Sequence, residues 1–198
     1  MRFHIDRIEK SSADLLGPGE RVEIWFHGCP FDCMGCITQD RNRSSEALLD
    51  LSIESVFNFI DESSVEGVTF SGGEPLMQIE PLIELSRMLK KNNYGIILYT
   101  GYTIEQIETM KDSSIILSFV DTLIDGRYVK KLDDNQPFRG SSNQRIINIT
   151  QRYADYYART GNRESTIMQN GPYLRLTGIP DERCKSLWKH VKMKGKGL

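Results

Sequence analysis

The sequence lacks long apolar runs, a marked excess of either charge and any apolar leader. Its longest apolar stretches, such as residues 96–99, are far too short to cross a bilayer, so no membrane role is expected. The 25 basic and 27 acidic side chains leave a net charge of -2, which argues against a nucleic-acid partner. Residues 1–6 carry no secretory signal, and we therefore expect a cytoplasmic protein.

Cysteine is also scarce, and three of the four cysteines occur on one short segment. Cys29, Cys33 and Cys36 are spaced C-x3-C-x2-C, whereas Cys184 lies near the other end of the chain. Thiolates hold iron–sulfur clusters, and a cubane [4Fe-4S] cluster offers four ligand positions. Three cysteines would leave one iron open, and an open coordination position is typical of a reactive metal centre.

Other interpretations of the cysteine segment stay open at this point. A closed zinc site usually pairs C-x2-C with further cysteines or histidines, and the late candidates here are only Cys184 and His190. Disulfides are not expected without a secretory signal. Cys184 could instead cap the cluster as its fourth ligand, although nothing around it resembles a ligand loop.

Short apolar runs alternate with amphipathic stretches along most of the 198 residues, which predicts one α/β domain with parallel strands and right-handed crossovers. A full eight-stranded barrel takes about 250 residues, so we predict a partial, open β/α barrel. The predicted strands span residues 3–8, 21–27, 65–70, 96–100, 120–125 and 146–149, and the predicted helices span 53–60, 81–91, 103–110 and 151–160.

The alternation stops after residue 125, and the last part of the chain reads differently. We predict a core over residues 1–150 and a C-terminal extension over residues 151–198. Residues 173–176 have the composition of a strand, and the lysine-rich tail is expected to be a solvated, frayed end. Two smaller predictions are an edge strand over residues 3–8 and a polar, helix-compatible segment over residues 44–51.

Several unusual segments fall where predicted strands end, beginning with the cysteine loop and residues 71–75. Ligands bind at the carboxyl ends of parallel strands, so these segments should converge on one rim. Gly72 and Gly73 permit close approach of a ligand to the backbone. Glu74 can bind an amine through its carboxylate, and the guanidinium of Arg127 can bind a carboxylate with two hydrogen bonds. Together these groups suit a ligand with an amino acid moiety, although Gly-Gly-Glu-Pro or Asp-Gly alone would more often be a turn.

At this point the sequence resembles the radical SAM superfamily. The C-x3-C-x2-C signature is matched by Cys29, Cys33 and Cys36, and its glycine-rich motif by residues 72–74. Within the superfamily, the chain is most similar to the small activases of glycyl-radical enzymes, in particular those that act on anaerobic ribonucleotide reductase. The segments that carry this likeness are residues 17–21, 25–30, 69–76, 99–102, 121–128 and 138–146.

The resemblance implies a [4Fe-4S] cluster on the three cysteines and S-adenosylmethionine bound at the open iron. It implies that a donor such as flavodoxin reduces the cluster, and that a 5′-deoxyadenosyl radical then takes a hydrogen atom from a glycine of a partner enzyme. Gly72, Gly73 and Glu74 would hold the methionine amino group, and Thr100 the ribose or methionine portion. Asp125 and Arg127 match the element that guides the cofactor carboxylate.

The chain departs from the activase pattern after about residue 152, because the remaining residues have no recognised counterpart. This extension could dock a partner or close over a substrate. It therefore keeps a second hypothesis open, a radical SAM enzyme that acts directly on a small molecule or peptide, similar to 7-carboxy-7-deazaguanine synthase. A third hypothesis, independent of the extension, is a metal-binding module without catalysis.

Overall fold

The computed structural model describes residues 1–11, 14–39, 47–170 and 173–194. A seven-stranded sheet forms its centre, in the order β3-β1-β2-β4-β5-β6-β7, and a two-stranded sheet pairs β8 with β9. The strands are β1 (Arg2–Ser11), β2 (Arg21–Phe26), β3 (Leu49–Ser52), β4 (Gly67–Gly72), β5 (Gly95–Tyr99), β6 (Thr122–Asp125), β7 (Arg145–Asn148), β8 (Ser165–Asn170) and β9 (Tyr173–Gly178).

The middle of the large sheet is parallel, because β2, β4, β5 and β6 run in the same direction. The outer pairs β1–β2 and β6–β7 are antiparallel. The predicted α/β class with a mainly parallel centre is therefore confirmed, whereas the partial barrel stays a prediction. Within the described ranges, no helix has the length and apolar character needed to cross a membrane.

Helices alternate with the strands as the periodicity predicts. In the first of them, Ser52 is the N-cap, its side chain accepting a hydrogen bond from the Ser55 backbone, and Ile53, Val56 and Ile60 are buried. A reciprocal capping box joins Thr103 and Gln106 at the start of another. The helices are α2 (Ile53–Glu62), α3 (Ile79–Lys91), α4 (Ile104–Thr109), α5 (Ser113–Ile116), α6 (Ala154–Tyr157) and α7 (Glu182–Lys194), with 3-10 turns η1 (Pro75–Gln78) and η2 (Lys130–Leu132).

The two faces of the sheet pack against hydrophobic clusters of different size. One face carries the main core, where β4 and β5 side chains such as Phe70 and Leu98 pack against apolar residues of α2 and α3, including Leu85. The other face holds a small cluster in which Tyr153, from the predicted extension, packs on Ile97 and Ile124. The chain beyond residue 150 therefore begins by packing against the sheet.

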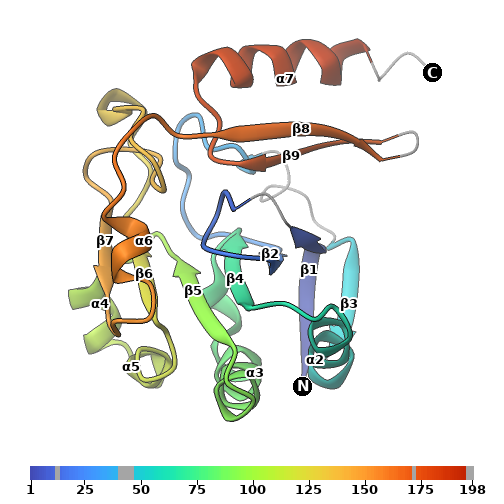
Figure 1. Ribbon diagram of the computed structural model, residues 1–198, viewed down its shortest axis with the longest axis vertical. Helices are drawn as coiled ribbons and strands as arrows, with labels where there is room; N and C mark the ends of the chain where they lie inside the picture. The colour runs from blue at the N-terminus through green and yellow to red at the C-terminus, as the bar shows by residue number, and fades with distance from the viewer. Residues whose placement is uncertain (12–13, 40–46, 171–172, 195–198) are drawn as a thin grey trace.

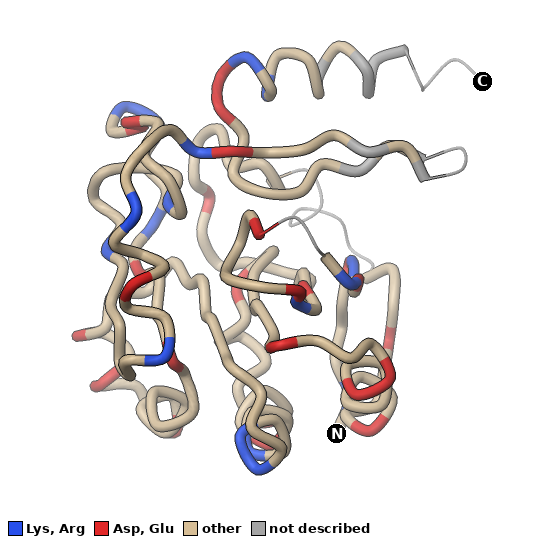
Figure 2. The backbone as a smooth tube through the Cα atoms, viewed as in Figure 1, with Lys and Arg blue, Asp and Glu red and all other residues tan. Residues whose placement is uncertain are grey.

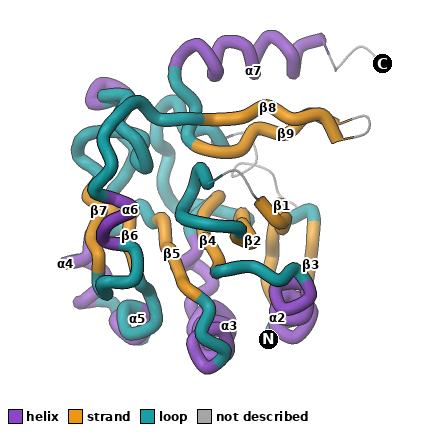
Figure 3. The backbone as a smooth tube through the Cα atoms, viewed as in Figure 1, coloured by secondary structure: helices purple, strands orange, loops and turns teal. Residues whose placement is uncertain are grey.

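A C-terminal layer, made of the described residues of 163–194 with β8, β9 and α7, lies across the ends of the parallel strands, and in Figure 1 the carboxyl ends of β4 and β5 face this layer. Loops fill the region between the layer and the sheet (Figure 3). Strand-like residues 173–176 are confirmed as part of β9. The division into a core of 1–150 and an extension of 151–198 stays a prediction, and residues 171–172 and 195–198 lie outside the described residues.

Three expectations need correction. Residues 3–8 were expected at a sheet edge, but β1 lies between β3 and β2, because the short β3 pairs with it on its outer side. Of the segment 44–51, residues 44–46 lie outside the described residues, and residues 49–52 form β3 rather than a helix. The lysine-rich tail is not a frayed end throughout, because residues 182–194 form α7.

Candidate functional site

The first cysteine of the loop lies three residues after the end of β2, at the carboxyl edge of the parallel strands. Cys29, Cys33 and Cys36 are free thiols of intermediate exposure. The Cys36 backbone donates a hydrogen bond to the Cys33 carbonyl over 3.1 Å, which forms a tight turn. Gly35 inside this turn has a φ of +81°, a conformation that side chains disfavour.

Burial dominates the electrostatics of two of these thiols. It raises the pKa of Cys29 to about 11, the Phe31 backbone N–H opposes this rise, and the Glu74 carboxylate adds to it. Burial also raises the pKa of Cys33, and the Tyr128 backbone N–H opposes that rise by hydrogen bonding. A bound metal centre would displace the protons of these thiols, because a coordinating thiol is deprotonated outright.

The chemistry of the donor set fits an iron–sulfur cluster better than zinc. In the part of the chain that the structure describes, no three His, Cys, Asp or Glu side chains are arranged to hold one metal ion. Zinc needs four ligands around a single ion, whereas a cluster spreads its cysteine ligands over several irons. Cys184 lies on α7 and lines a different surface depression, together with Glu164 and Leu187.

Gly72 at the end of β4 and Gly73 directly after it bring this segment against the cysteine loop. A Cβ on Gly72 would lie 2.6 Å from the Phe26 backbone nitrogen, and one on Gly73 would lie 2.0 Å from the Gly28 oxygen. Only glycine fits such contacts. The Thr38 hydroxyl donates to the Gly72 carbonyl over 3.1 Å, so the segment and the loop are joined on both sides of the cysteines.

Glu74 lies at the site but is already engaged by the protein. Its buried carboxylate accepts hydrogen bonds from the Leu76 N–H at 3.0 Å, the Thr100 hydroxyl at 2.8 Å and the Gly101 N–H at 2.8 Å. Burial raises the pKa of Glu74 to about 7, although these hydrogen bonds oppose the rise. Glu74 and Thr100 therefore connect the ends of β4 and β5, and their expected contacts with a ligand stay predictions.

Asp125 is buried and engaged by the protein, as Glu74 is, whereas Arg127 is exposed. The buried Asp125 carboxylate accepts from the Ile104 N–H at 2.8 Å and pairs with Arg145, so it ties β6 to α4 and β7. Arg127 is exposed, and its guanidinium carbon lies 4.2 Å from the ring centre of Phe31 in the cysteine loop. Of the polar residues that the sequence singles out, Arg127 is the one with an exposed head group at the loop.

Two aromatic residues complete the site and were not singled out from the sequence. Phe31 packs edge-on against Tyr102, with ring centres 4.8 Å apart, and closely covers Gly101. Tyr128 follows Arg127 and contacts the loop through both its ring and its backbone. The available signal was the glycine beside each ring, because a missing side chain at Gly101 or Gly35 leaves room for a neighbour.

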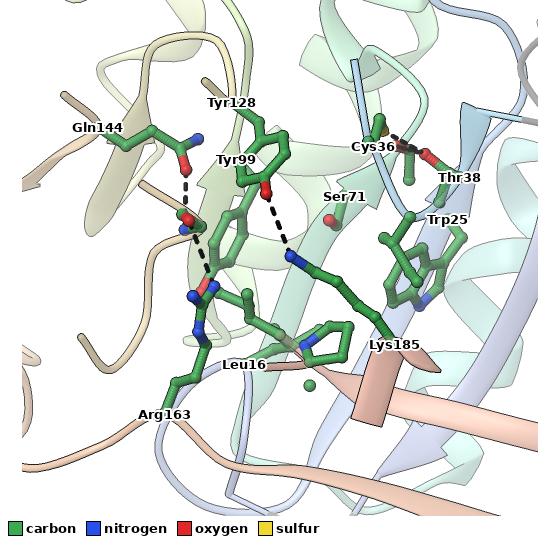
Figure 4. A pocket seen from close by; sticks show the side chains of 17 residues that line it. Leu16, Trp25, Cys36, Thr38, Ser71, Tyr99, Tyr128, Gln144, Arg163 and Lys185 are labelled. Atoms are coloured by element: carbon green, nitrogen blue, oxygen red, sulfur yellow. Dashed lines mark hydrogen bonds between the residues drawn. The ribbon is translucent and has the colours of Figure 1, made fainter. Parts of the chain in front are cut away.

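A cavity of about 140 Å³ opens beside the third cysteine, between the sheet and the C-terminal layer (Figure 4). Its walls include Cys36, Thr38 and Gly72 on one side and Arg163 and Lys185 on the other. A neighbouring cavity of about 350 Å³ shares Trp25, Thr38 and Gly72 with it and extends towards Leu176. Residues from the ends of β2, β4 and β5 therefore meet at one rim, and the C-terminal layer covers part of it.

Comparison with known proteins places this geometry in a family. A family model described as "4Fe-4S single cluster domain" matches residues 15–147. The chain is 32% identical over 140 residues to the anaerobic ribonucleoside-triphosphate reductase-activating protein of Enterobacteria phage T4, covering 68% of this chain and 87% of that one. The chain belongs to this family of radical SAM activases. The resemblance seen in the sequence is thereby confirmed, and so is the expectation of an enzyme.

Other relatives carry the same name. The Haemophilus influenzae protein is 30% identical over 141 residues, which cover 67% of this chain and 90% of the relative. The Escherichia coli K12 protein is 26% identical over 142 residues, covering 67% and 91% respectively. Among solved structures, QueE from Escherichia coli superposes with a TM-score of 0.42 at 20% identity, covering 52% of this chain and 54% of QueE.

Proposed function

We propose that the protein holds a [4Fe-4S] cluster on Cys29, Cys33 and Cys36, cleaves S-adenosylmethionine reductively and generates a glycyl radical on a partner enzyme such as anaerobic ribonucleotide reductase. One observation carries this proposal: a loop with three free cysteines lies at the carboxyl edge of the parallel strands, against the Gly72–Gly73 backbone and Arg127. The names of its relatives support the class of partner. A flavodoxin-like protein is the proposed electron donor.

The residues around the loop would bind and orient the substrate. When bound, the cluster would supply the electron that splits the sulfonium and so yields a 5′-deoxyadenosyl radical for hydrogen abstraction. The exposed Arg127 fork suits the carboxylate of S-adenosylmethionine, and the bare backbone at Gly72 and Gly73 suits its amino group. Glu74 would act by holding the ends of β4 and β5 in place, because its carboxylate already accepts three hydrogen bonds.

The test of the chemistry is an anaerobic turnover measurement. The protein is reconstituted with iron and sulfide, reduced with dithionite and mixed with S-adenosylmethionine, and 5′-deoxyadenosine is quantified. We expect product from wild type and from Cys184→Ala, and a loss of at least 100-fold in Cys33→Ala, since three ligands are needed to leave a single iron open. Equal product from Cys33→Ala and wild type would refute the assignment of the loop.

The test of the partner adds a purified anaerobic ribonucleotide reductase to the same mixture. Electron paramagnetic resonance should then detect a glycyl radical on the reductase, and none when Cys33→Ala replaces wild type. Cleavage of S-adenosylmethionine without any radical on the reductase would retain the cluster chemistry and refute this partner.

The covered cavity favours one other candidate function, which is direct action on a small molecule or peptide. The C-terminal layer contributes Arg163, Pro180 and Lys185 to the cavity beside Cys36, so a compound could be enclosed there. In that case a small compound, with no partner protein present, would raise the yield of 5′-deoxyadenosine. No such rise is expected if the substrate is a glycine of a partner enzyme.

A further inference from the structure

Tyr128 connects the cysteine loop to the rest of the molecule through its ring. The residue follows β6 by three positions, and its ring lies between two glycines. A Cβ on Gly140 would lie 2.8 Å from the Tyr128 ring, and one on Gly35, between the second and third cysteines, would lie 3.7 Å from it. The ring therefore fills a slot that the glycines leave open, in direct contact with the loop.

The backbone of Tyr128 also reaches a candidate cluster ligand. Its N–H lies beside the Cys33 sulfur, where it is placed to donate to a cluster ligand. Hydrogen bonds to the sulfurs are one of the features that set the reduction potential of an iron–sulfur cluster. Contacts that hold the Tyr128 backbone in place would therefore influence the reduction potential of the cluster that Cys33 would hold.

The hydroxyl of Tyr128 is fixed by the C-terminal helix. Lys185 on α7, 57 residues further along the chain, donates from Nζ to the Tyr128 hydroxyl over 3.1 Å (Figure 4). That hydroxyl in turn donates to Asp133 Oδ2 over 3.1 Å, and Lys185 donates to the same Asp133 oxygen over 3.0 Å. The three groups form a closed triangle of hydrogen bonds.

A second cation from the C-terminal part stabilises the triangle. Arg163 forms a salt bridge with the other oxygen of Asp133 and donates to the Gly140 carbonyl over 3.3 Å. The Asp133 side chain is only 12% exposed, and that of Arg163 only 2%. Loss of these cations would leave the largely buried carboxylate poorly compensated, so the C-terminal residues help to hold Asp133 on Tyr128.

We infer that Lys185, acting through the Tyr128 hydroxyl, is a positioning residue for the cysteine loop, and that α7 thereby tunes the cluster held by Cys29, Cys33 and Cys36. The inference rests on the proposed function, because it requires a cluster at these cysteines. It assigns the C-terminal layer a role in the chemistry of the loop in addition to covering the cavity. With the triangle broken, Tyr128 would hold its N–H less firmly on Cys33 and the reduced cluster would lose stabilisation.

The test measures the midpoint potential of the reconstituted cluster, by redox titration followed with electron paramagnetic resonance. Tyr128→Phe is the decisive variant, because it removes only the hydroxyl and leaves every charge in place. Lys185→Met removes the same hydrogen bond together with a positive charge. Arg183→Met is the matched control, since Arg183 is an exposed cation on the same helix.

We expect the midpoint potential to become more negative in Tyr128→Phe and in Lys185→Met, and to stay at the wild-type value in Arg183→Met. The double variant Tyr128→Phe/Lys185→Met should show less than the sum of the two single shifts, because both changes remove one shared contact. Lys185→Arg, which keeps a donor and a charge, should restore most of the wild-type potential.

A wild-type potential in Tyr128→Phe, with the cluster fully loaded, would overturn the inference even if Lys185→Met were shifted, because charge alone would then explain that shift. Loss of the cluster in Lys185→Met would support the inference if Lys185→Arg kept it, and would overturn it if both variants lost it equally. Failure of wild type to bind any cluster would instead refute the proposed function. The iron content of wild type separates these two failures.

Discussion

The seven-stranded sheet and the C-terminal layer are held in place by different kinds of contact. Side chains of the sheet such as Phe70 and Leu98 are completely buried among apolar neighbours. The C-terminal layer instead docks through polar contacts, including Arg163 and Lys185 on Asp133 and an Arg7 hydrogen bond of 3.1 Å to the Leu176 carbonyl. Acidic and basic residues follow one another along the backbone where α7 begins (Figure 2).

The difference shows that one kind of contact, apolar burial, stabilises the fold of this chain, and another kind, polar contacts, positions the residues of the site. Apolar burial is strong and nondirectional, so it specifies a sheet but not the position of single atoms. Charged hydrogen bonds contribute less net stability, yet their geometry is directional. Contacts of the second kind reach Tyr128 and the cysteine loop, which is where atomic positions matter most.

The largest expected effect tests the apolar side of this comparison. Phe70→Ala removes a ring that is 0% exposed and packs edge-on against Phe26, with ring centres 5.9 Å apart. We expect a loss of about 3–5 kcal/mol in the free energy of unfolding, measured by urea denaturation, because the mutation leaves a cavity. Leu174→Ala on β9, where the side chain is 39% exposed, is the control and should cost less than about 1 kcal/mol.

Equal losses in the two variants would mean that the C-terminal layer shares the apolar core and would contradict the comparison.

The elements of the sheet were predictable because their signals are local. Buried runs such as residues 96–99 predict strands, and caps such as Ser52 and Thr103 mark helix starts within one turn of the chain. The position of β1 inside the sheet was not predictable, because it depends on pairing with four residues of β3 that follow a polar segment. Pairing between distant segments leaves no periodic signal.

The sequence could predict which residues form the candidate site, but not how buried each side chain is or which groups it contacts. Cysteine spacing and glycine motifs identify which segments meet, but burial decides what each side chain does there. Glu74 was expected to face a ligand amine, and that contact stays a prediction, while its carboxylate also accepts hydrogen bonds from Leu76 in η1 and from Thr100 directly after β5. Tyr128 and Lys185 escaped notice because an aromatic in a loop and a lysine in a basic tail are both ordinary on their own.

The second prediction concerns the pH dependence of stability. Burial raises the pKa of Glu74 from 4.5 to about 7, so the folded protein holds a proton there that the unfolded chain releases at lower pH. Stability should therefore fall by roughly 3 kcal/mol as the pH rises from about 4.5 to about 7. Glu74→Gln cannot titrate and should lack this component of the slope.

The measurement is the free energy of unfolding of the metal-free protein at a series of pH values from 5 to 8, compared between wild type and Glu74→Gln. Glu54→Gln is the control, because Glu54 is a fully exposed carboxylate. Parallel curves for wild type and Glu74→Gln would show that Glu74 titrates normally and that its surroundings are more polar than the buried contacts indicate.

The smallest expected effect tests the polar side of the comparison. Arg163→Met removes one of two cations on the buried Asp133, while Lys185 remains 3.0 Å from it. Because one partner is left, we expect a loss of about 2 kcal/mol, below the usual cost of stranding a buried charge. The loss should be local, so limited proteolysis should cleave between residues 163 and 181 faster than in wild type, with the sheet protected.

Arg159→Met is the matched control, since the Arg159 pair with Asp14 is about half exposed and should contribute little. Faster cleavage throughout the chain of Arg163→Met would show that the sheet and the C-terminal layer unfold as one unit, and the polar contacts would then be part of global stability rather than a local means of positioning the loop.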